Sequence, residues 1–337
     1  MFKKNTVIFW VLMITFTLSF MEIFSSIYYF QRWGNYEAPF AVVQLWHSVK
    51  KRIDQSGILE QPKLNSRYVN DDRFGWSLRK NKKTVDACGD NKITYTIDSN
   101  KERFIPGPKI LAGYIVFLGG SFTFGTCVND RESYPYILAT EHWKNWDIRN
   151  AAVGAWGTSQ AYLMLSDLIE SNTPPSMIIY GMISHHIQRN YLNRRWIQQL
   201  AKSGRKLPHF ELVNGDLVFQ GIVGLSASIK NDREFRNKEI ELTSAFLSSM
   251  QKKSAERDIP FIVVLLPTTG RETYPPSVMD TMYKSNIPVL GLTMLPYEGL
   301  ESDPYKHPNP MDTRRMAKAI ANSFISDVLG NLEPSVQ

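Results

Sequence analysis

The stretch from Tyr114 to Gly125, with the sequence YIVFLGGSFTFG, most constrains what this chain can fold into. Its first five residues form an unbroken run of apolar, β-forming side chains, which is typical of a strand buried on both faces. Two glycines then end the strand and deliver Ser121 to the carboxyl edge of a sheet, where open α/β folds place their ligand sites. Ser121 is therefore a candidate active-site serine with its amide free to face a substrate. The alternative is a glycine-rich turn with a solvated serine.

Strand-like and helix-like segments alternate along the rest of the chain. Five segments are predicted as strands, at 114–118, 148–153, 177–183, 260–266 and 288–292. Helices are predicted at 134–143, at 159–169 with Thr158 as N-cap, and at 234–256. An insertion at 185–230 contains the Asn214-Gly215 pair that marks a β-hairpin. This order predicts an α/β fold, a three-layer α/β/α sandwich built on a five-stranded parallel sheet.

The end of the chain carries the clearest helix signals. Asn309 is placed to cap a helix whose first residue is Pro310, and an apolar stripe then continues to Gly330, which is expected to end the helix. His307 lies just ahead of this helix, and Asp303 lies four residues earlier. The last loop therefore offers a histidine and an aspartate at the same sheet edge as the serine.

A serine, a histidine and an aspartate are the three residue types of a hydrolytic triad. The loops that follow parallel strands meet at one edge of the sheet, so Ser121, His307 and Asp303 are the candidate nucleophile, proton shuttle and orienting acid. A histidine ahead of a helix is also commonly a cap or a surface residue, and that alternative stays open.

Three segments resemble sequence blocks of the SGNH (GDSL-type) hydrolase superfamily. Residues 117–125 look like its first block, and His307-Pro308-Asn309 followed by a helix is similar to its last. Residues 150–157, NAAVGAWG, resemble the second block, whose glycine amide helps to form the oxyanion hole and maps best to Gly154. The resemblance spans roughly residues 112–330. It implies a flavodoxin-like sandwich of five parallel strands that hydrolyses or transfers acyl esters, with no metal or other cofactor.

The sequence departs from the family pattern in the first, third and last blocks. Gly120 stands where the family has an aspartate beside the nucleophile, and the acid precedes its histidine by four residues instead of three. The third block normally supplies an asparagine to the oxyanion hole, whereas residues 181–187 offer Ser184, His185 or His186. His185 is the candidate substitute donor, and a structural histidine is the alternative.

The amino-terminal region, residues 1–33, has the pattern of a membrane anchor. Lys3 and Lys4 precede an apolar run from Thr6 to Phe30 that contains one charge, Glu22. As a helix this run spans about 37 Å, enough for a tilted crossing of a bilayer. The lysines favour a cytoplasmic amino terminus, with the main domain outside the inner or plasma membrane. A cleaved signal peptide is the alternative, but the long run and the missing cleavage pattern favour an uncleaved anchor.

Residues 34–110 are predicted to link this anchor to a hydrolase-like domain at 111–330. An amphipathic helix is expected at 38–56, followed by a polar arm or small accessory sheet with β-like pieces such as 93–97. The two cysteines of the chain, Cys88 in the arm and Cys127 close after Ser121, are permitted to form a disulfide in an extracytoplasmic domain. Two buried free thiols are the alternative.

The charge balance bears on which macromolecules could be partners of this chain. Lys and Arg number 39 against 32 Asp and Glu, and no basic helix concentrates the excess, so nucleic acid is not implied. An anchored extracytoplasmic esterase points to acylated glycans of the cell envelope, with O-acetyl groups as the favoured case and envelope polysaccharide machinery as a partner. Phe122, Phe124 and Trp156 are candidates to stack on sugar rings, with core packing as the alternative.

Three functions remain open at this point. Esterase and O-acyltransferase share a covalent serine ester and differ in whether water or a sugar hydroxyl accepts the acyl group. A catalytically inactive domain that binds glycan or scaffolds an envelope complex is the third. Gly120 and the missing asparagine favour the inactive reading, whereas the retained serine, aspartate and histidine favour the enzyme.

Overall fold

The structure, a computed structural model, describes residues 65–107, 113–191, 194–224, 235–269 and 273–332, together with Thr17 and Phe20. Apart from Thr17 and Phe20, the predicted membrane segment lies outside these residues, and so does the amphipathic helix predicted at 38–56. Within the described part of the chain, no helix is both long and apolar enough to cross a membrane. Pro62–Gln337 forms one compact unit.

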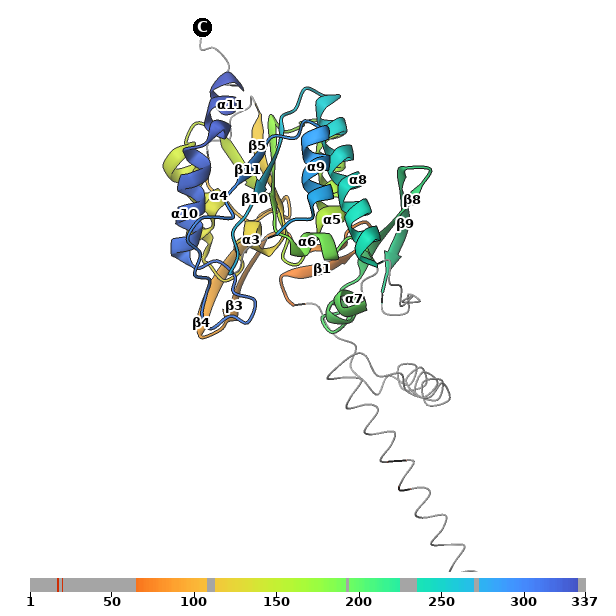
Figure 1. Cartoon of the computed structure of the whole chain (residues 1–337). Coiled ribbons are helices and arrows are strands. Elements are labelled where there is room, and N and C mark those ends of the chain that lie inside the picture. The colour runs from red at the N-terminus through yellow and green to blue at the C-terminus, as the bar shows by residue number, and fades with distance from the viewer. Residues whose placement is uncertain are drawn as a thin grey trace, which may run out of the picture. The chain divides into compact units, whose positions relative to one another are not determined.

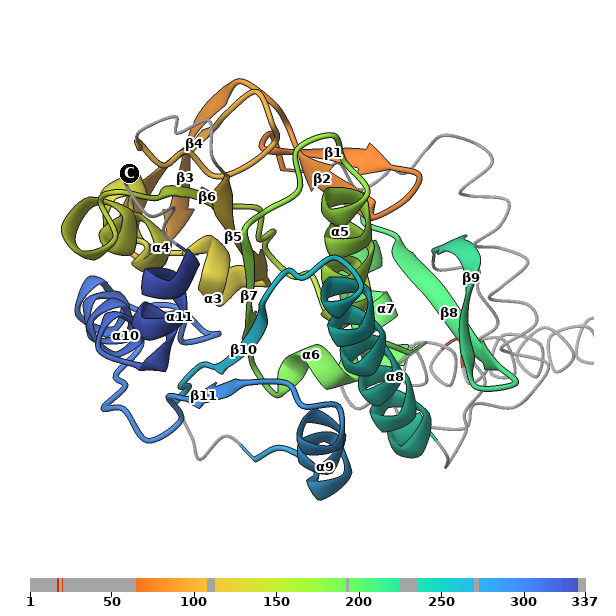
Figure 2. The same ribbon diagram turned by 90° about the horizontal axis from the view of Figure 1, so that it is seen from above.

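A parallel sheet of five strands lies at the centre of this unit, as predicted (Figure 2). The strands are β5 (Tyr114–Gly119), β6 (Asp147–Asn150), β7 (Met177–Met182), β10 (Phe261–Leu265) and β11 (Val289–Gly291). Their spatial order is β11-β10-β7-β5-β6, so the first strand along the chain lies between the second and the third. This is the flavodoxin-like order, and its switch point lies between β5 and β7, where ligands bind at the carboxyl ends.

Helices cover both faces of the sheet (Figures 1 and 2). One layer contains α5 (Thr158–Ile169), α8 (Phe235–Ala255) and α9 (Pro276–Lys284). The other contains α4 (Tyr134–Ile137) with its continuing turn Leu138–His142, α10 (Pro310–Ala321) and α11 (Phe324–Leu332). Side chains of β5 alternate between the layers: Ile115 and Phe117 pack under α4 and α10, whereas Val116 and Leu118 pack under α5 and α8. Burial on both faces explains why this strand has no polar residue.

The predicted arm before the sheet consists of two antiparallel hairpins. The first pairs β1 (Tyr68–Asp71) with β2 (Gly75–Leu78), and the second pairs β3 (Lys82–Cys88) with β4 (Asn91–Ile97). A third apolar cluster joins these hairpins to the carboxyl edge of the sheet, with Trp76 and Tyr95 packed among Phe124 and Trp156. Phe122, Phe124 and Trp156 are 6%, 0% and 0% exposed, so core packing, not sugar stacking, accounts for them.

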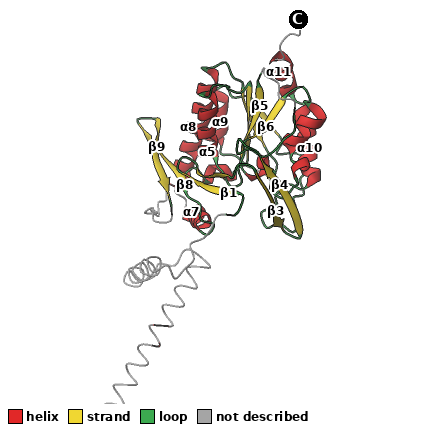
Figure 3. Ribbon diagram, turned by 180° about the vertical axis from the view of Figure 1, so that it is seen from behind, coloured by secondary structure: helices red, strands yellow, loops and turns green. Residues whose placement is uncertain are grey.

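The insertion after β7 contains two short helices and a hairpin. These are α6 (His185–Gln188), α7 (Arg194–Ala201), β8 (Leu207–Val213) and β9 (Asp216–Val223). Asn214 and Gly215 make the turn with φ angles of 53° and 89°, which confirms the predicted Asn-Gly hairpin. The remaining short elements are α3 (Ser121–Phe124) and a 3₁₀ turn at Asp130–Glu132. Figure 3 shows the strands and helices of this region by type.

Two helix boundaries differ from the prediction. The N-cap of α5 is Gly157, and Thr158 is the first helical residue. The closing helix does not continue to Gly330, because it ends at Ala321 with Asn322 as its C-cap, and a separate helix, α11, contains that glycine. Asn309 does cap α10, accepting from the amides of Met311 and Asp312, with Pro310 as the first residue. The cap was predictable because its signal is local, whereas the break at Asn322 lies inside a continuous apolar pattern.

Candidate active site

Ser121 is the first residue of α3, directly after β5 reaches the carboxyl edge of the sheet. Gly119 has a φ of 153°, and the Phe124 amide donates to Gly120 O at 2.9 Å, so the chain turns sharply at the two glycines. The Ser121 side chain is 6% exposed, and no described residue accepts a hydrogen bond from its amide. The serine therefore stands at the predicted edge with its N–H available.

Arg103 holds the turn that follows α3. Its Nη1 donates to Phe124 O at 2.6 Å and to Gly125 O, and its Nη2 donates to Val128 O at 2.7 Å. The side chain is 1% exposed and pairs with Asp130 at 3.4 Å. Burial lowers the pKa of Arg103 to about 10, so it remains a cation at neutral pH and satisfies carbonyls that the end of a helix leaves open. Nothing local in the sequence marks this arginine as buried, so its role could not be predicted.

Asp303 lies against His307, as a catalytic pair requires. Asp303 Oδ2 is 2.7 Å from His307 Nδ1 and accepts from the backbone amide of the same residue at 2.8 Å. Burial raises the pKa of Asp303, but the side-chain and backbone hydrogen bonds from His307 lower it more, so its pKa lies below the ordinary value. The four-residue spacing is thus compatible with the contact, since Lys306, between the two, has a φ of 50° that folds the loop back.

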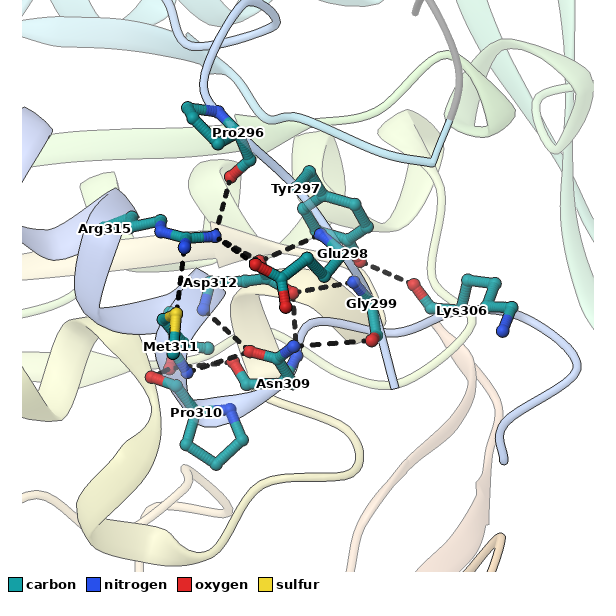
Figure 4. Close-up of polar contacts among 11 residues, drawn as sticks. Pro296, Tyr297, Glu298, Gly299, Lys306, Asn309, Pro310, Met311, Asp312 and Arg315 are labelled. Atoms are coloured by element: carbon teal, nitrogen blue, oxygen red, sulfur yellow. Dashed lines mark hydrogen bonds and ion pairs between the residues drawn. The ribbon is translucent and has the colours of Figure 1, made fainter. Parts of the chain in front are cut away.

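The loop before α10 is fixed by a second carboxylate, Asp312 (Figure 4). Asp312 is 1% exposed and accepts from the amides of Glu298, Gly299 and Asn309 at 3.1, 2.8 and 3.1 Å. The Leu300 amide donates to His307 O at 2.8 Å. These contacts hold the histidine-bearing loop on the helix start, which is the kind of support that a positioned catalytic group needs.

The histidine loop and the serine helix lie next to each other. The His307 ring is 5.7 Å from the Phe122 ring, centroid to centroid, and Phe122 is the residue after the serine. Because Asp303 occupies Nδ1, Nε2 is the nitrogen left to accept a proton. Among the described residues no hydrogen bond joins this nitrogen to Ser121 Oγ, so proton transfer needs a closer approach of the two groups, as is common in structures without substrate.

Gly154 lies beside the serine turn with a free amide. The Val153 amide donates to Gly119 O at 3.2 Å, which aligns this loop with the end of β5. Gly154 O accepts from Trp76 Nε1 at 3.2 Å, whereas its N–H has no acceptor in the described part of the chain. Two unpaired amides, those of Ser121 and Gly154, are therefore available at one edge. Their use as oxyanion donors stays a prediction.

The two histidines of the predicted third block, His185 and His186, differ in their exposure to solvent. His185 is exposed at the start of α6, and its use as an oxyanion donor stays a prediction. His186 is 1% exposed, and its Nδ1 lies 2.8 Å from Tyr180 Oη. Burial and the nearby Arg189 and His185 hold the pKa of His186 well below its usual range, so it is neutral.

His186 also explains the glycine that precedes Ser121. A Cβ built on Gly120 would lie 2.6 Å from His186 Nε2, 3.0 Å from Trp156 O and 3.2 Å from Arg189 Nη1. Arg189 Nη1 in turn donates to Trp156 O at 2.8 Å. The space in which a larger residue would place its side chain is thus already filled from α6, which the sequence did not reveal.

The two cysteines form a disulfide, and it lies against the loop that carries Asp303 and His307. Cys88 at the end of β3 is joined to Cys127, with 5.4 Å between their Cα atoms. Cys127 Sγ is 3.8 Å from His307 Nδ1, and both sulfurs lie within 4.8 Å of an Asp303 oxygen. The bond therefore ties the accessory arm to the loops that carry the serine and the histidine.

Comparisons with known proteins were made at three levels. No family model matches the chain, and no curated protein matches it. Among solved structures, the chain is similar to an acetyl xylan esterase, Est2A, from Butyrivibrio proteoclasticus. The two sequences are 14% identical, the match covers 68% of this chain and 67% of that chain, and the TM-score is 0.39. It is similar to a member of the lipolytic protein G-D-S-L family from Veillonella parvula, with 15% identity, 63% and 98% covered, and a TM-score of 0.36. It is also similar to LAE5, an alpha/beta hydrolase enzyme from a lake metagenome, with 10% identity, 68% and 99% covered, and a TM-score of 0.39.

Proposed function

We propose that this chain is a serine-dependent ester hydrolase or O-acyltransferase of the SGNH type. The observation that carries the proposal is the 2.7 Å contact between Asp303 and His307 Nδ1, in a loop packed against the helix that begins with Ser121. A buried carboxylate on Nδ1 fixes the ring and stabilises the imidazolium that forms when the other nitrogen takes a proton. A surface histidine or a cap would not require this partner.

The mechanism follows from the positions of these groups. Ser121 Oγ attacks the carbonyl carbon of an acyl ester, and its proton passes to His307 Nε2 as the Oγ–C bond forms. The carbonyl electron pair moves onto oxygen, which faces the free amides of Ser121 and Gly154. Collapse of this adduct returns the proton to the departing alcohol and leaves an acyl-serine. Water, or a hydroxyl of an acceptor sugar, then releases the acyl group by the reverse path.

The proposed substrate is an O-acylated glycan, with O-acetyl as the favoured group. Tyr305 supports this choice, because its ring is 64% exposed and lies 5.9 Å from the His307 ring. An exposed aromatic ring beside the catalytic base suits the apolar face of a sugar. The Tyr305 hydroxyl accepts a hydrogen bond from Gln199 Nε2 on α7 at 2.9 Å. The ring is therefore positioned both by α7 and by its contact with His307.

A serine-directed probe tests the proposal. A fluorophosphonate should label the wild-type protein, and Ser121→Ala should abolish labelling, whereas Ser171→Ala, an exposed serine outside the site, should leave it unchanged. Release of acetate from an acetylated xylo-oligosaccharide, with and without an added acceptor sugar, then separates hydrolysis from transfer. Equal labelling of wild type and Ser121→Ala would instead favour a domain that binds glycan without catalysis.

The proposed location is outside the cytoplasm, on an uncleaved amino-terminal anchor. This rests on Lys3 and Lys4 and on the apolar run at 6–30, which favour that orientation. A carboxyl-terminal reporter that is active only outside the cytoplasm should be active when fused to the full chain. Activity only of a cytoplasmic reporter would refute the topology and, with it, the envelope substrate.

A further inference from the structure

A tyrosine hydroxyl from the accessory arm lies against Gly154, on the side where a Cβ would project. Tyr68 Oη is 2.6 Å from the point that a Cβ on Gly154 would occupy, and it is the nearest heavy atom to that point. Tyr68 is 2% exposed, and no described residue forms a hydrogen bond with its hydroxyl. A phenol at this depth normally has a partner, so its O–H is available to a group that enters the site.

The same point is lined by a second hydroxyl from the serine turn. Thr126 Oγ1 lies 3.7 Å from the Cβ position of Gly154. The Thr126 amide donates to Ser121 O at 2.9 Å, so this residue belongs to the turn that immediately follows the nucleophile. Hydroxyl groups of the arm and of the serine turn therefore converge on one side of Gly154. A side chain at 154 would collide with the Tyr68 hydroxyl, which explains the glycine.

Two guanidinium groups stand over the ring of Tyr68. Arg205 Cζ is 4.4 Å and Arg67 Cζ is 5.1 Å from the ring centroid. Arg67 pairs with Asp86 at 3.1 Å, whereas Arg205 has no carboxylate partner among the described residues. Positive charge beside the ring draws electron density from the phenol oxygen and favours negative charge next to it. The hydroxyl is thus a strengthened hydrogen-bond donor.

We infer that Tyr68 donates a hydrogen bond to the developing oxyanion, as a third donor beside the amides of Ser121 and Gly154. This inference rests on the proposed function. When the serine attacks, the carbonyl oxygen gains an electron pair and the proton goes to His307, while Tyr68 keeps its own proton and only donates. The accessory arm thereby supplies the third oxyanion donor, and none of Ser184, His185 or His186 is needed as a donor.

The test compares Tyr68→Phe with Tyr283→Phe, a control at an 85% exposed tyrosine. Phenylalanine keeps the ring packed against the two guanidinium groups, so the thermal midpoint and circular dichroism should be unchanged. The kcat for p-nitrophenyl acetate should fall on the order of 10²-fold with KM unchanged, because one oxyanion donor contributes that much. The rate of fluorophosphonate labelling should fall in the same direction, since its phosphoryl oxygen occupies the same place.

The outcomes separate this inference from the proposed function. An equal labelling rate for wild type and Tyr68→Phe, or a change in KM alone, would overturn the donor role while leaving the esterase intact. Absence of Ser121 labelling in the wild type would overturn both. If the phenylalanine variant fails to fold, replacement of Tyr68 by 3-fluorotyrosine decides: a stronger donor should keep or raise the labelling rate, and a slower rate would refute the inference.

Discussion

Removal of the disulfide should destabilise this domain by an amount that the structure allows us to calculate. The bond joins residues 39 positions apart, so breaking it frees a loop of that length in the unfolded chain. In the chain-entropy model a loop of this size contributes about 4 kcal/mol to the free energy of unfolding. The half-cystines Cys88 and Cys127 are 8% and 3% exposed, so their replacement by alanine also removes a small amount of buried apolar contact.

The assay is urea unfolding followed by tryptophan fluorescence. Three samples are compared: the untreated wild type, the wild type with a phosphine reductant, and the double variant Cys88→Ala with Cys127→Ala. The reduced wild type should lie about 4 kcal/mol below the untreated protein, and the double variant should lie slightly lower because it also loses buried contact. Free-thiol titration of denatured, unreduced wild type should find no thiol. A difference below about 1 kcal/mol, or two titratable thiols, would refute the reasoning.

The same change should also slow the reaction that we propose for Ser121 and His307. Cys127 Sγ packs 3.8 Å from His307 Nδ1, and the bond fixes the turn after the serine to the arm. We expect slower fluorophosphonate labelling in the double variant under conditions where it is still folded. Unchanged labelling would show that the serine turn is held by Arg103 without help from the disulfide.

Asp303→Asn should slow fluorophosphonate labelling by at least about 10²-fold, because the imidazolium loses its charged partner; an unchanged rate would mean a serine–histidine dyad. Burial, and then repulsion from Asp98, raise the pKa of Glu102 to about 8. The contribution of protonated Glu102 to the free energy of unfolding is fully present below the pKa of this group in the unfolded chain, and it is lost as pH rises through about 8. Glu102→Gln should therefore match wild type in thermal melts at about pH 4 and exceed it by a few kcal/mol at about pH 9, and parallel pH curves for the two proteins would contradict this. Gly120→Ala should cost about 1–3 kcal/mol in urea unfolding because its Cβ would lie 2.6 Å from His186 Nε2, whereas Gly291→Ala, with no atom within 4 Å, should cost less; equal costs would count against the packing explanation.

The sequence by itself determined the architecture of the sheet and nominated Ser121, Asp303 and His307 as a candidate triad. The apolar run at 114–118, its glycine break and the Asn309 cap are local signals, because each depends on residues within one turn or one strand. Parallel connectivity then brings the ends of all five strands to one edge, so Ser121 and His307 could be assigned to the same edge before any coordinates were known. The sequence pattern failed where a local signal was absent, as at the break after α10.

Only the tertiary structure decided what surrounds those residues. His186 against Gly120, Tyr68 against Gly154 and Arg103 under the serine turn are contacts between segments far apart along the chain. Propensity and periodicity describe which face of an element is buried, but not which atom of another element lies opposite it. That choice depends on how the arm and the insertion after β7 pack on the finished sheet, and close packing admits one arrangement of their side chains.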